Sequence, residues 1–214
     1  MKKIKLADHI YFVRFKTQYD CCSTMLRFQE HYESPNAQFR KYPFDLETFM
    51  DWYAKVNGNF TYYSDWSGFN IPSYILSEFY HGGFDPLSFK EEMFLDMFAN
   101  EQGEKFYIIA TYTMDNDKKW EKEVIKHELA HALWYVNDEY KKQVNKILKT
   151  ADKDAYDKFR ATLIRKGYAA PVMKDEFQAY LVGPSPGMGD DPALKPVAKA
   201  VNEVFNYFSK DIKV

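Results

Sequence analysis

The chain has 214 residues, a formal net charge of −2 and a sequence pI of about 6.2. This nearly balanced charge excludes a broad basic surface, so we expect no binding to nucleic acid and none to an anionic membrane. No apolar run approaches the length of about 18 residues that a membrane-spanning helix needs. The N-terminal residues lack the apolar stretch of a signal peptide, and the adjacent residues Cys21 and Cys22 rarely fit disulfide geometry. We therefore expect a cytoplasmic protein with reduced thiols.

A chain of this length can form one sizeable core or two small lobes. Aromatic residues make up 18% of the sequence, and most of them precede residue 140. We expect an aromatic-rich α+β N-terminal lobe over residues 1–100 and a catalytic lobe over residues 101–214, with a single compact unit as the alternative. In the first lobe the hydrophobic pattern predicts strands over residues 10–15 and 60–63, and helices over residues 18–33, 46–56, 72–80 and 85–98.

The second lobe opens with the strongest strand pattern in the chain. Residues 106–112, FYIIATY, are rich in β-branched and aromatic side chains. A polar turn with several candidate N-cap residues follows, and the pattern then predicts a helix over residues 118–136. Four more helices are predicted, over residues 138–150, 153–166, 172–182 and 194–209. The expected fold class is α+β, with a helical C-terminal part.

A histidine motif lies inside the predicted 118–136 helix, where residues 127–131 read His-Glu-Leu-Ala-His. Histidines four residues apart project from the same helix face, so His127 and His131 can both reach one tetrahedral cation. Glu128 stands beside them as a candidate general base for a water molecule activated by the metal. A chance pair of histidines next to a surface glutamate is the competing interpretation. The predicted helix, with a strand before it, favours the metal site.

Catalytic zinc sites usually take three protein ligands and leave a fourth position open. No histidine follows His131, so we expect the third ligand to be a carboxylate further along the chain. Glu176 is the first choice, because it lies among apolar residues of the predicted 172–182 helix, where a carboxylate is costly to bury without a cation. Asp175, Asp138 and Glu139 are the competing candidates.

The strand, the histidine motif and Glu176 together resemble the catalytic core of zincin metallopeptidases of the gluzincin type, over about residues 106–182. The resemblance implies a zincin-like fold with a small sheet whose edge strand packs on the active-site helix. Residues 106–112 would be that edge strand and would pair with an extended peptide. The resemblance also implies one Zn²⁺ ion per chain, bound by His127, His131 and Glu176.

This sequence departs from the family at one position. The family often has an aspartate four residues after the glutamate ligand, where it orients a zinc-binding histidine. Here that position is Tyr180, so the orienting role falls to Tyr180, Asp175 or another residue. Tyr180 is also a candidate catalytic hydrogen-bond donor, although in a chain with 17 tyrosines packing is the competing role.

We therefore expect a zinc metallopeptidase that acts on a peptide or protein substrate, with Glu128 as its general base. Two hypotheses of a different class stay open. One is a zinc hydrolase of a non-peptide amide or ester, because the motif specifies the water chemistry and not the bond that is cleaved. The second is a non-catalytic, zinc-stabilised interaction protein.

Overall fold

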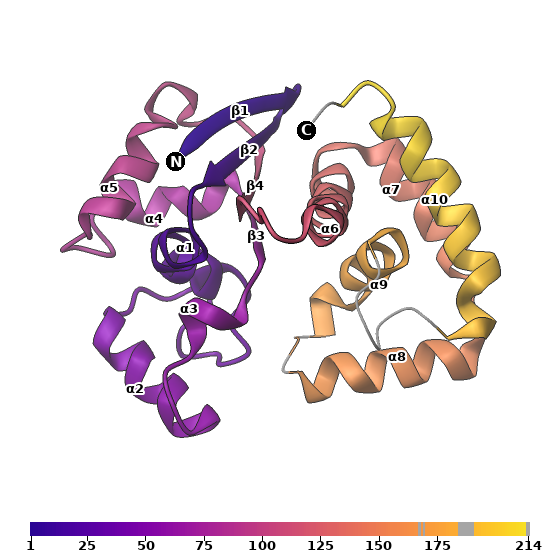
Figure 1. Ribbon diagram of the computed structural model, residues 1–214, viewed down its shortest axis with the longest axis horizontal. Coiled ribbons are helices and arrows are strands. Elements are labelled where there is room, and N and C mark those ends of the chain that lie inside the picture. The colour runs from indigo at the N-terminus through magenta and orange to yellow at the C-terminus, as the bar shows by residue number, and fades with distance from the viewer. Residues whose placement is uncertain (167, 169, 184–190, 213–214) are drawn as a thin grey trace. The chain divides into compact units, whose positions relative to one another are not determined.

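The computed structural model describes residues 1–166, 168, 170–183 and 191–212. These residues form ten α-helices and a four-stranded mixed sheet, which confirms the expected α+β class and the helical C-terminal part. The chain divides into two compact units, Met1–Thr113 and Met114–Val214 (Figure 1). The sheet belongs to the first unit, and the second unit is helical.

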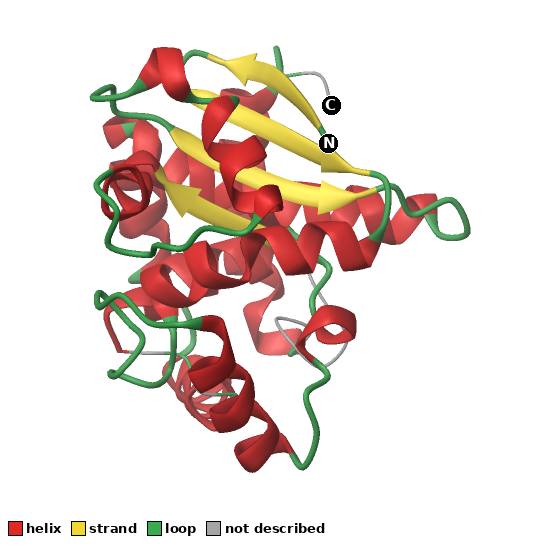
Figure 2. Ribbon diagram, turned by 90° about the vertical axis from the view of Figure 1, so that its left-hand side faces the viewer, coloured by secondary structure: helices red, strands yellow, loops and turns green. Residues whose placement is uncertain are grey.

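The sheet of the N-terminal unit has the strand order β1-β2-β4-β3 (Figure 2). Its strands are β1 (Lys2–Ala7), β2 (Ile10–Phe15), β3 (Gly68–Pro72) and β4 (Tyr107–Tyr112). The strands β1 and β2 form an antiparallel hairpin, β2 runs parallel to β4, and β3 runs antiparallel to β4.

The expectation that residues 106–112 form an edge strand is wrong. The strand β4 lies inside the sheet and pairs with β2 on one side and β3 on the other. Five of its six residues are buried, a pattern typical of a strand that is covered on both faces and bonded at both edges. The continuous apolar run in the sequence fits this interior position. An edge strand usually carries charged residues, as the lysine-rich β1 does.

The helix α1 (Gln18–Glu33) packs across β2, β3 and β4. The helix α2 (Leu46–Asn57) begins at Asp45, whose side chain accepts a hydrogen bond from the Thr48 amide, and ends at Gly58 with a left-handed φ of 84°. A capping box begins α5 (Phe89–Asp96), where Ser88 and Glu91 bond each other's backbone. Two short helices complete this unit, α3 (Tyr62–Asp65) and α4 (Leu76–Tyr80).

Three predicted elements of the N-terminal unit differ in the structure. The helix predicted over residues 85–98 is shorter, because α5 begins at Phe89 after its cap at Ser88 and ends at Asp96. The predicted strand at residues 60–63 is replaced by the helix α3, because the Tyr62 ring is fully buried against Phe49 and Phe69, and this packing overrides the β-propensity of aromatic residues. The helix predicted from Pro72 starts later. Pro72 ends β3, and a 3-10 turn over Ser73–Ile75 precedes α4.

The helices of the C-terminal unit agree with the predicted order. They are α6 (Lys118–Val136), α7 (Asp138–Leu148), α8 (Lys153–Arg165), α9 (Met173–Val182) and α10 (Lys195–Ser209). The helix α9 packs against α6, α8 and α10, and α7 packs against α6 and α10. A central α9 therefore brings its own side chains next to those of the motif helix α6.

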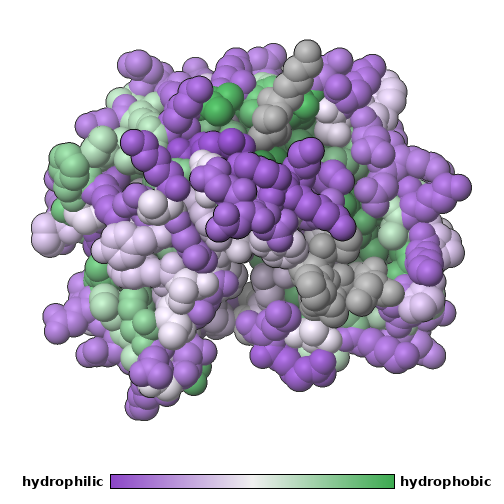
Figure 3. Space-filling model, in the orientation of Figure 1, coloured by the Kyte–Doolittle hydropathy of each residue, from purple (hydrophilic) through white to green (hydrophobic). Residues whose placement is uncertain are grey.

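The visible face of the molecule is covered largely by hydrophilic residues, with smaller apolar areas between them (Figure 3). Among the described residues, no helix combines the length and the apolar character needed to cross a bilayer.

Candidate metal centre

The motif residues lie in the second half of α6, a helix of 19 residues. Asp117 begins this helix by accepting a hydrogen bond from the Trp120 amide at 2.8 Å. Because one helical turn separates His127 from His131, the two imidazoles lie on the same face, and their Nε2 atoms are 3.2 Å apart. The spacing of the sequence thus gives the expected local geometry.

Glu176 comes from the first turn of α9 and is 3% exposed. Its Oε2 atom lies 3.8 Å from Nε2 of His127, and its Oε1 atom lies 3.6 Å from Nε2 of His131. One ligand atom from each of the three residues therefore lies within 4.8 Å of the others. The structure brings together the three residues that the sequence singled out.

These separations fit a tetrahedral metal ion. Bonds of about 2.0–2.1 Å to a tetrahedral zinc ion place any two ligand atoms about 3.3–3.4 Å apart. The three observed separations of 3.2, 3.6 and 3.8 Å lie close to that value. In addition, Oε2 of Glu176 is buried and has no hydrogen-bond partner, an unfavourable state that a cation would relieve. The donor set of two imidazoles and one carboxylate is one that zinc accepts.

The buried charges perturb one another strongly. Burial raises the pKa of Glu176 to about 8, with Asp175 and Glu128 adding to the effect. Burial and the neighbouring His131 lower the pKa of His127 to about 3. Burial also lowers the pKa of His131, but the carboxylates of Asp175 and Glu176 outweigh it and hold this pKa well above its ordinary value. Three carboxyl groups, those of Asp175, Glu176 and Glu128, therefore act on one imidazole, and a bound cation would favour the charged form of Glu176.

Glu128 is 7% exposed and lies next to the two histidines in the chain. Its negative charge contributes to the raised pKa values of His131, Glu176 and Tyr180. The carboxylate therefore acts electrostatically on the centre.

Asp175, a competing candidate for the third ligand, is not part of the group of three ligand residues. Its Oδ1 atom lies 2.9 Å from Nδ1 of His131, on the side of the ring away from the other ligand atoms. A carboxylate at this position orients a metal-binding histidine. Asp175, the residue just before Glu176, is one of the candidates named above for orienting a histidine, and it lies next to His131.

Tyr180 lies beside His127, with ring centroids 4.5 Å apart in an edge-to-face arrangement. Its hydroxyl is 3.4 Å from that of Tyr168, and burial, followed by Glu176, raises its pKa to about 12. Tyr180 is therefore a neutral hydroxyl next to the centre. Two candidates for the third ligand, Asp138 and Glu139, are exposed in the first turn of α7 and are not part of the cluster.

A glycine brings the end of α9 close to α6. A Cβ atom at Gly183 would lie 2.6 Å from the carbonyl oxygen of Glu123 and 2.8 Å from the amide nitrogen of His127. The backbone of Gly183 and Ala179 offsets part of the lowering of the His127 pKa by burial, which places the last turn of α9 next to this imidazole. The role of Gly183 was not predicted, because the contact depends on how two distant helices approach each other.

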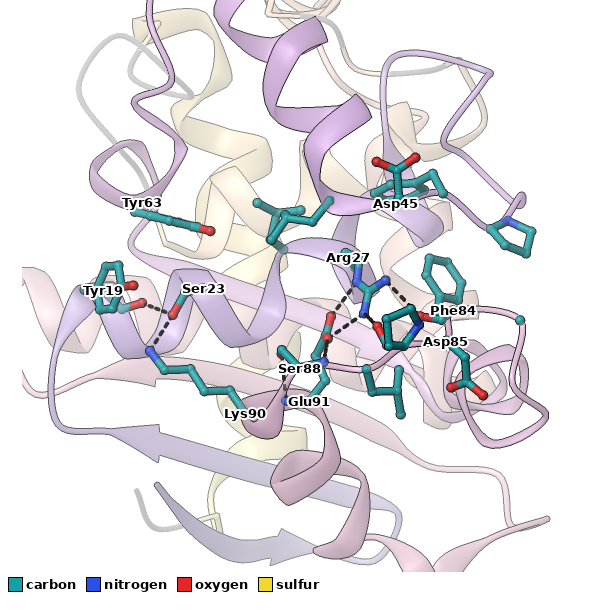
Figure 4. Close-up of a pocket in the computed structure, with 17 residues that line it drawn as sticks. Tyr19, Ser23, Arg27, Asp45, Tyr63, Phe84, Asp85, Ser88, Lys90 and Glu91 are labelled. Carbon is teal, nitrogen blue, oxygen red and sulfur yellow. Dashed lines mark hydrogen bonds and ion pairs between the residues drawn. The ribbon is translucent and has the colours of Figure 1, made fainter.

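A separate cavity of about 700 Å³ lies in the N-terminal unit (Figure 4). Its buried charges are Arg27 and Glu91, which form a two-pronged ion pair with distances of 2.7 and 2.6 Å. Arg27 also donates to the carbonyl oxygens of Phe84 and Pro86. Since these bonds tie α1 to α5 and to the 84–86 segment, we interpret the pair as structural.

Comparison of the chain with protein-family models, with curated proteins and with solved structures finds no match. The geometry of the centre in residues 114–214 therefore carries the functional interpretation.

Proposed function

We propose that the protein is a zinc-dependent hydrolase in which His127, His131 and Glu176 bind one Zn²⁺ ion per chain. The observation that carries this proposal is the approach of three ligand atoms to within 4.8 Å of one another, beside the buried carboxylate of Glu128. A structural zinc site usually closes its fourth position with a fourth protein ligand, whereas the group found among the described residues supplies three. A catalytic site with an open position fits this donor set.

Bound zinc would polarise the substrate carbonyl and lower the pKa of a water molecule in the open position. Glu128 then accepts a proton from the attacking water and returns it to the leaving group. Tyr180 adds a neutral hydroxyl beside His127, available to donate a hydrogen bond to the oxygen on which charge develops. Glu128 and Glu176 are 7% and 3% exposed, and electrostatic interactions are stronger at such buried positions than in water.

We propose an amide or ester as the bond that is cleaved. A peptide bond is supported by the likeness of the His-Glu-Leu-Ala-His motif to that of gluzincin peptidases. The interior position of β4 removes the argument that this strand holds an extended peptide. A non-peptide amide or ester therefore has equal standing as the substrate.

The test compares the zinc-loaded protein with its Glu128→Gln variant on a peptide library and on a panel of small amides and esters. We expect hydrolysis in one of the two panels, and a decrease of roughly a hundredfold or more in the variant, because the base is lost while size and helix are kept. Zinc content should be unchanged. Glu139→Gln is the matched control, since it removes the same charge at an exposed position.

Two results would contradict the proposal. Near-normal turnover in Glu128→Gln would show that this carboxylate is not the base. A zinc-loaded protein that cleaves neither panel would favour the non-catalytic, zinc-stabilised interaction protein.

A further inference from the structure

Two buried polar residues, Gln178 of α9 and Tyr140 of α7, lie behind the candidate metal centre. We propose that they are positioning residues for His131, on which they act through Asp175. The inference rests on the proposed function, because it takes His131 to be a metal ligand. It adds two residues that neither the motif nor the ligand set contains.

Three successive side-chain contacts link Tyr140 to His131. The Tyr140 hydroxyl donates to Oε1 of Gln178 at 2.7 Å, and Nε2 of Gln178 donates to Oδ1 of Asp175 at 3.0 Å. The same Oδ1 atom lies 2.9 Å from Nδ1 of His131. Tyr140 and Gln178 are fully buried, so water does not compete for their hydrogen bond, and the Asp175 side chain is 17% exposed beside a His131 that is 1% exposed.

Hydrogen-bond donation runs in one direction, from Tyr140 through Gln178 to Asp175. Burial raises the pKa of Tyr140, so its hydroxyl stays neutral and donates to the carbonyl oxygen of Gln178. That bond turns the amide NH₂ of Gln178 toward Asp175, which as a carboxylate only accepts. Nδ1 of His131 and Oδ1 of Asp175 approach to 2.9 Å without the geometry of a hydrogen bond, so this last contact is electrostatic. A neutral, metal-binding His131 would carry its proton on Nδ1 beside this carboxylate, and its Nε2 atom would face Glu176 and His127.

The local sequence explains the positions of Gln178 and Tyr140. Gln178 follows Asp175 by three positions on α9, so the two side chains lie on the same helix face. Tyr140 lies in the first turn of α7, where the Asn137 side chain accepts a hydrogen bond from its amide at 2.9 Å. A polar glutamine in an otherwise apolar stretch of α9 was the signal in the sequence that could have indicated this role.

The competing explanation is a polar network that only holds α7 against α9. Zinc affinity separates the two, because a structural network changes stability without changing the zinc ligand. We would measure zinc dissociation constants by chelator competition, together with the absorption spectrum of the cobalt(II) form. The variants are Asp175→Ala, Gln178→Met and Tyr140→Phe. The matched control is Tyr156→Phe, which removes a hydroxyl from a ring that packs on Phe177 of α9.

We expect Asp175→Ala to weaken zinc binding by about 10- to 100-fold, the usual effect of removing such a partner, and the other two variants by about tenfold. Each should alter the cobalt spectrum, and Tyr156→Phe should change neither readout. In the Asp175→Ala background, Tyr140→Phe and Gln178→Met should cause no further loss, because their effect passes through Asp175.

Unchanged zinc affinity and cobalt spectra in Tyr140→Phe and Gln178→Met, alongside lowered stability, would overturn the positioning role. Full additivity with Asp175→Ala would overturn it as well. Failure of the unmodified protein to bind zinc would instead refute the proposed function, and the positioning role with it.

Discussion

Two buried glutamates, Glu176 and Glu30, have different surroundings. Burial raises the pKa of Glu176 to about 8 and that of Glu30 to about 7. The carboxylate of Glu176 lies 3.8 and 3.6 Å from the imidazoles of His127 and His131, with which it could bind a cation. Glu30, in α1, lies near Ser34 and Tyr62, which offset only part of the effect of burial. Among the described residues, its Oε2 atom has no hydrogen-bond partner, and Glu30 belongs to no group that could hold a cation. We therefore assign Glu176 to function, and we expect Glu30 to cost stability when it ionises.

The sign of this effect follows from proton linkage. The pKa of Glu30 is about 7 in the folded protein against 4.5 for the ordinary group, so between these values the folded state holds a proton that the unfolded state has lost. Stability therefore falls as pH rises from 4.5 to 7, by about 1.4 kcal/mol for each unit, or about 3 kcal/mol in total. Glu30→Gln should remove this loss and stabilise the protein at pH 8.

Urea unfolding at pH 5, 6, 7 and 8 checks this prediction. The gain in unfolding free energy of Glu30→Gln over the unmodified protein should increase up to about pH 7 and then stay level. A difference that does not vary with pH would show that Glu30 ionises normally in the folded state.

At the scale of elements, the centre depends on how closely α9 approaches α6. The two helices meet at Gly183, where a Cβ atom would lie 2.6 to 2.9 Å from the backbone of Glu123 and from His127. Backbone atoms cannot move aside as the end of a flexible side chain can. A methyl group here should push the end of α9 away and shift His127 relative to Glu176.

We predict that Gly183→Ala lowers the unfolding free energy by roughly 1–3 kcal/mol, the usual cost of overpacking, and weakens zinc binding by about tenfold or more. Thermal unfolding of the metal-free protein and chelator competition measure the two effects. Unchanged zinc affinity in a folded Gly183→Ala protein would show that the close contact does not position His127.

The sequence predicts elements best where local signals agree. The helices α1, α2 and α6 to α10 have clear apolar spacing, and caps such as Asp45 and Asp117 mark their starts. The elements that differ depend on distant partners. The aromatic segment at Tyr62 becomes a helix because its ring is buried, and β1 and β3 exist only through pairing with β2 and β4.

The same distinction applies to the candidate site. His127 and His131 follow from spacing on a single helix, and Glu176 follows from the cost of burying a carboxylate in α9. The roles of Gly183 and Gln178 could not be predicted in this way, because they arise only when α9 packs on α6. The interior place of β4 was missed for a different reason: the edge position came from the family resemblance rather than from the apolar run itself.

At the scale of the whole molecule, the three ligand residues and Glu128 all belong to Met114–Val214, while the sheet belongs to Met1–Thr113. Removal of the metal should therefore lower the stability of the C-terminal unit and leave that of the N-terminal unit unchanged. A ligand at 100 times its dissociation constant stabilises the state that binds it by about 2.7 kcal/mol.

We predict that a chelator accelerates amide hydrogen exchange in α6 and α9, by up to about 100-fold, and leaves β2 and β4 unchanged. Segment-resolved exchange, measured with and without zinc, checks this expectation. Equal acceleration in both units would show that the metal does not act through the C-terminal unit.

Metal content tests the central claim most directly. Elemental analysis of the purified protein, reconstituted with zinc and then dialysed, should give about one zinc ion per chain. The variants His127→Ala, His131→Ala and Glu176→Ala should each lose it, because two remaining ligands rarely hold zinc against buffer. Full zinc occupancy in any of these three variants, or a metal-free unmodified protein, would contradict the account.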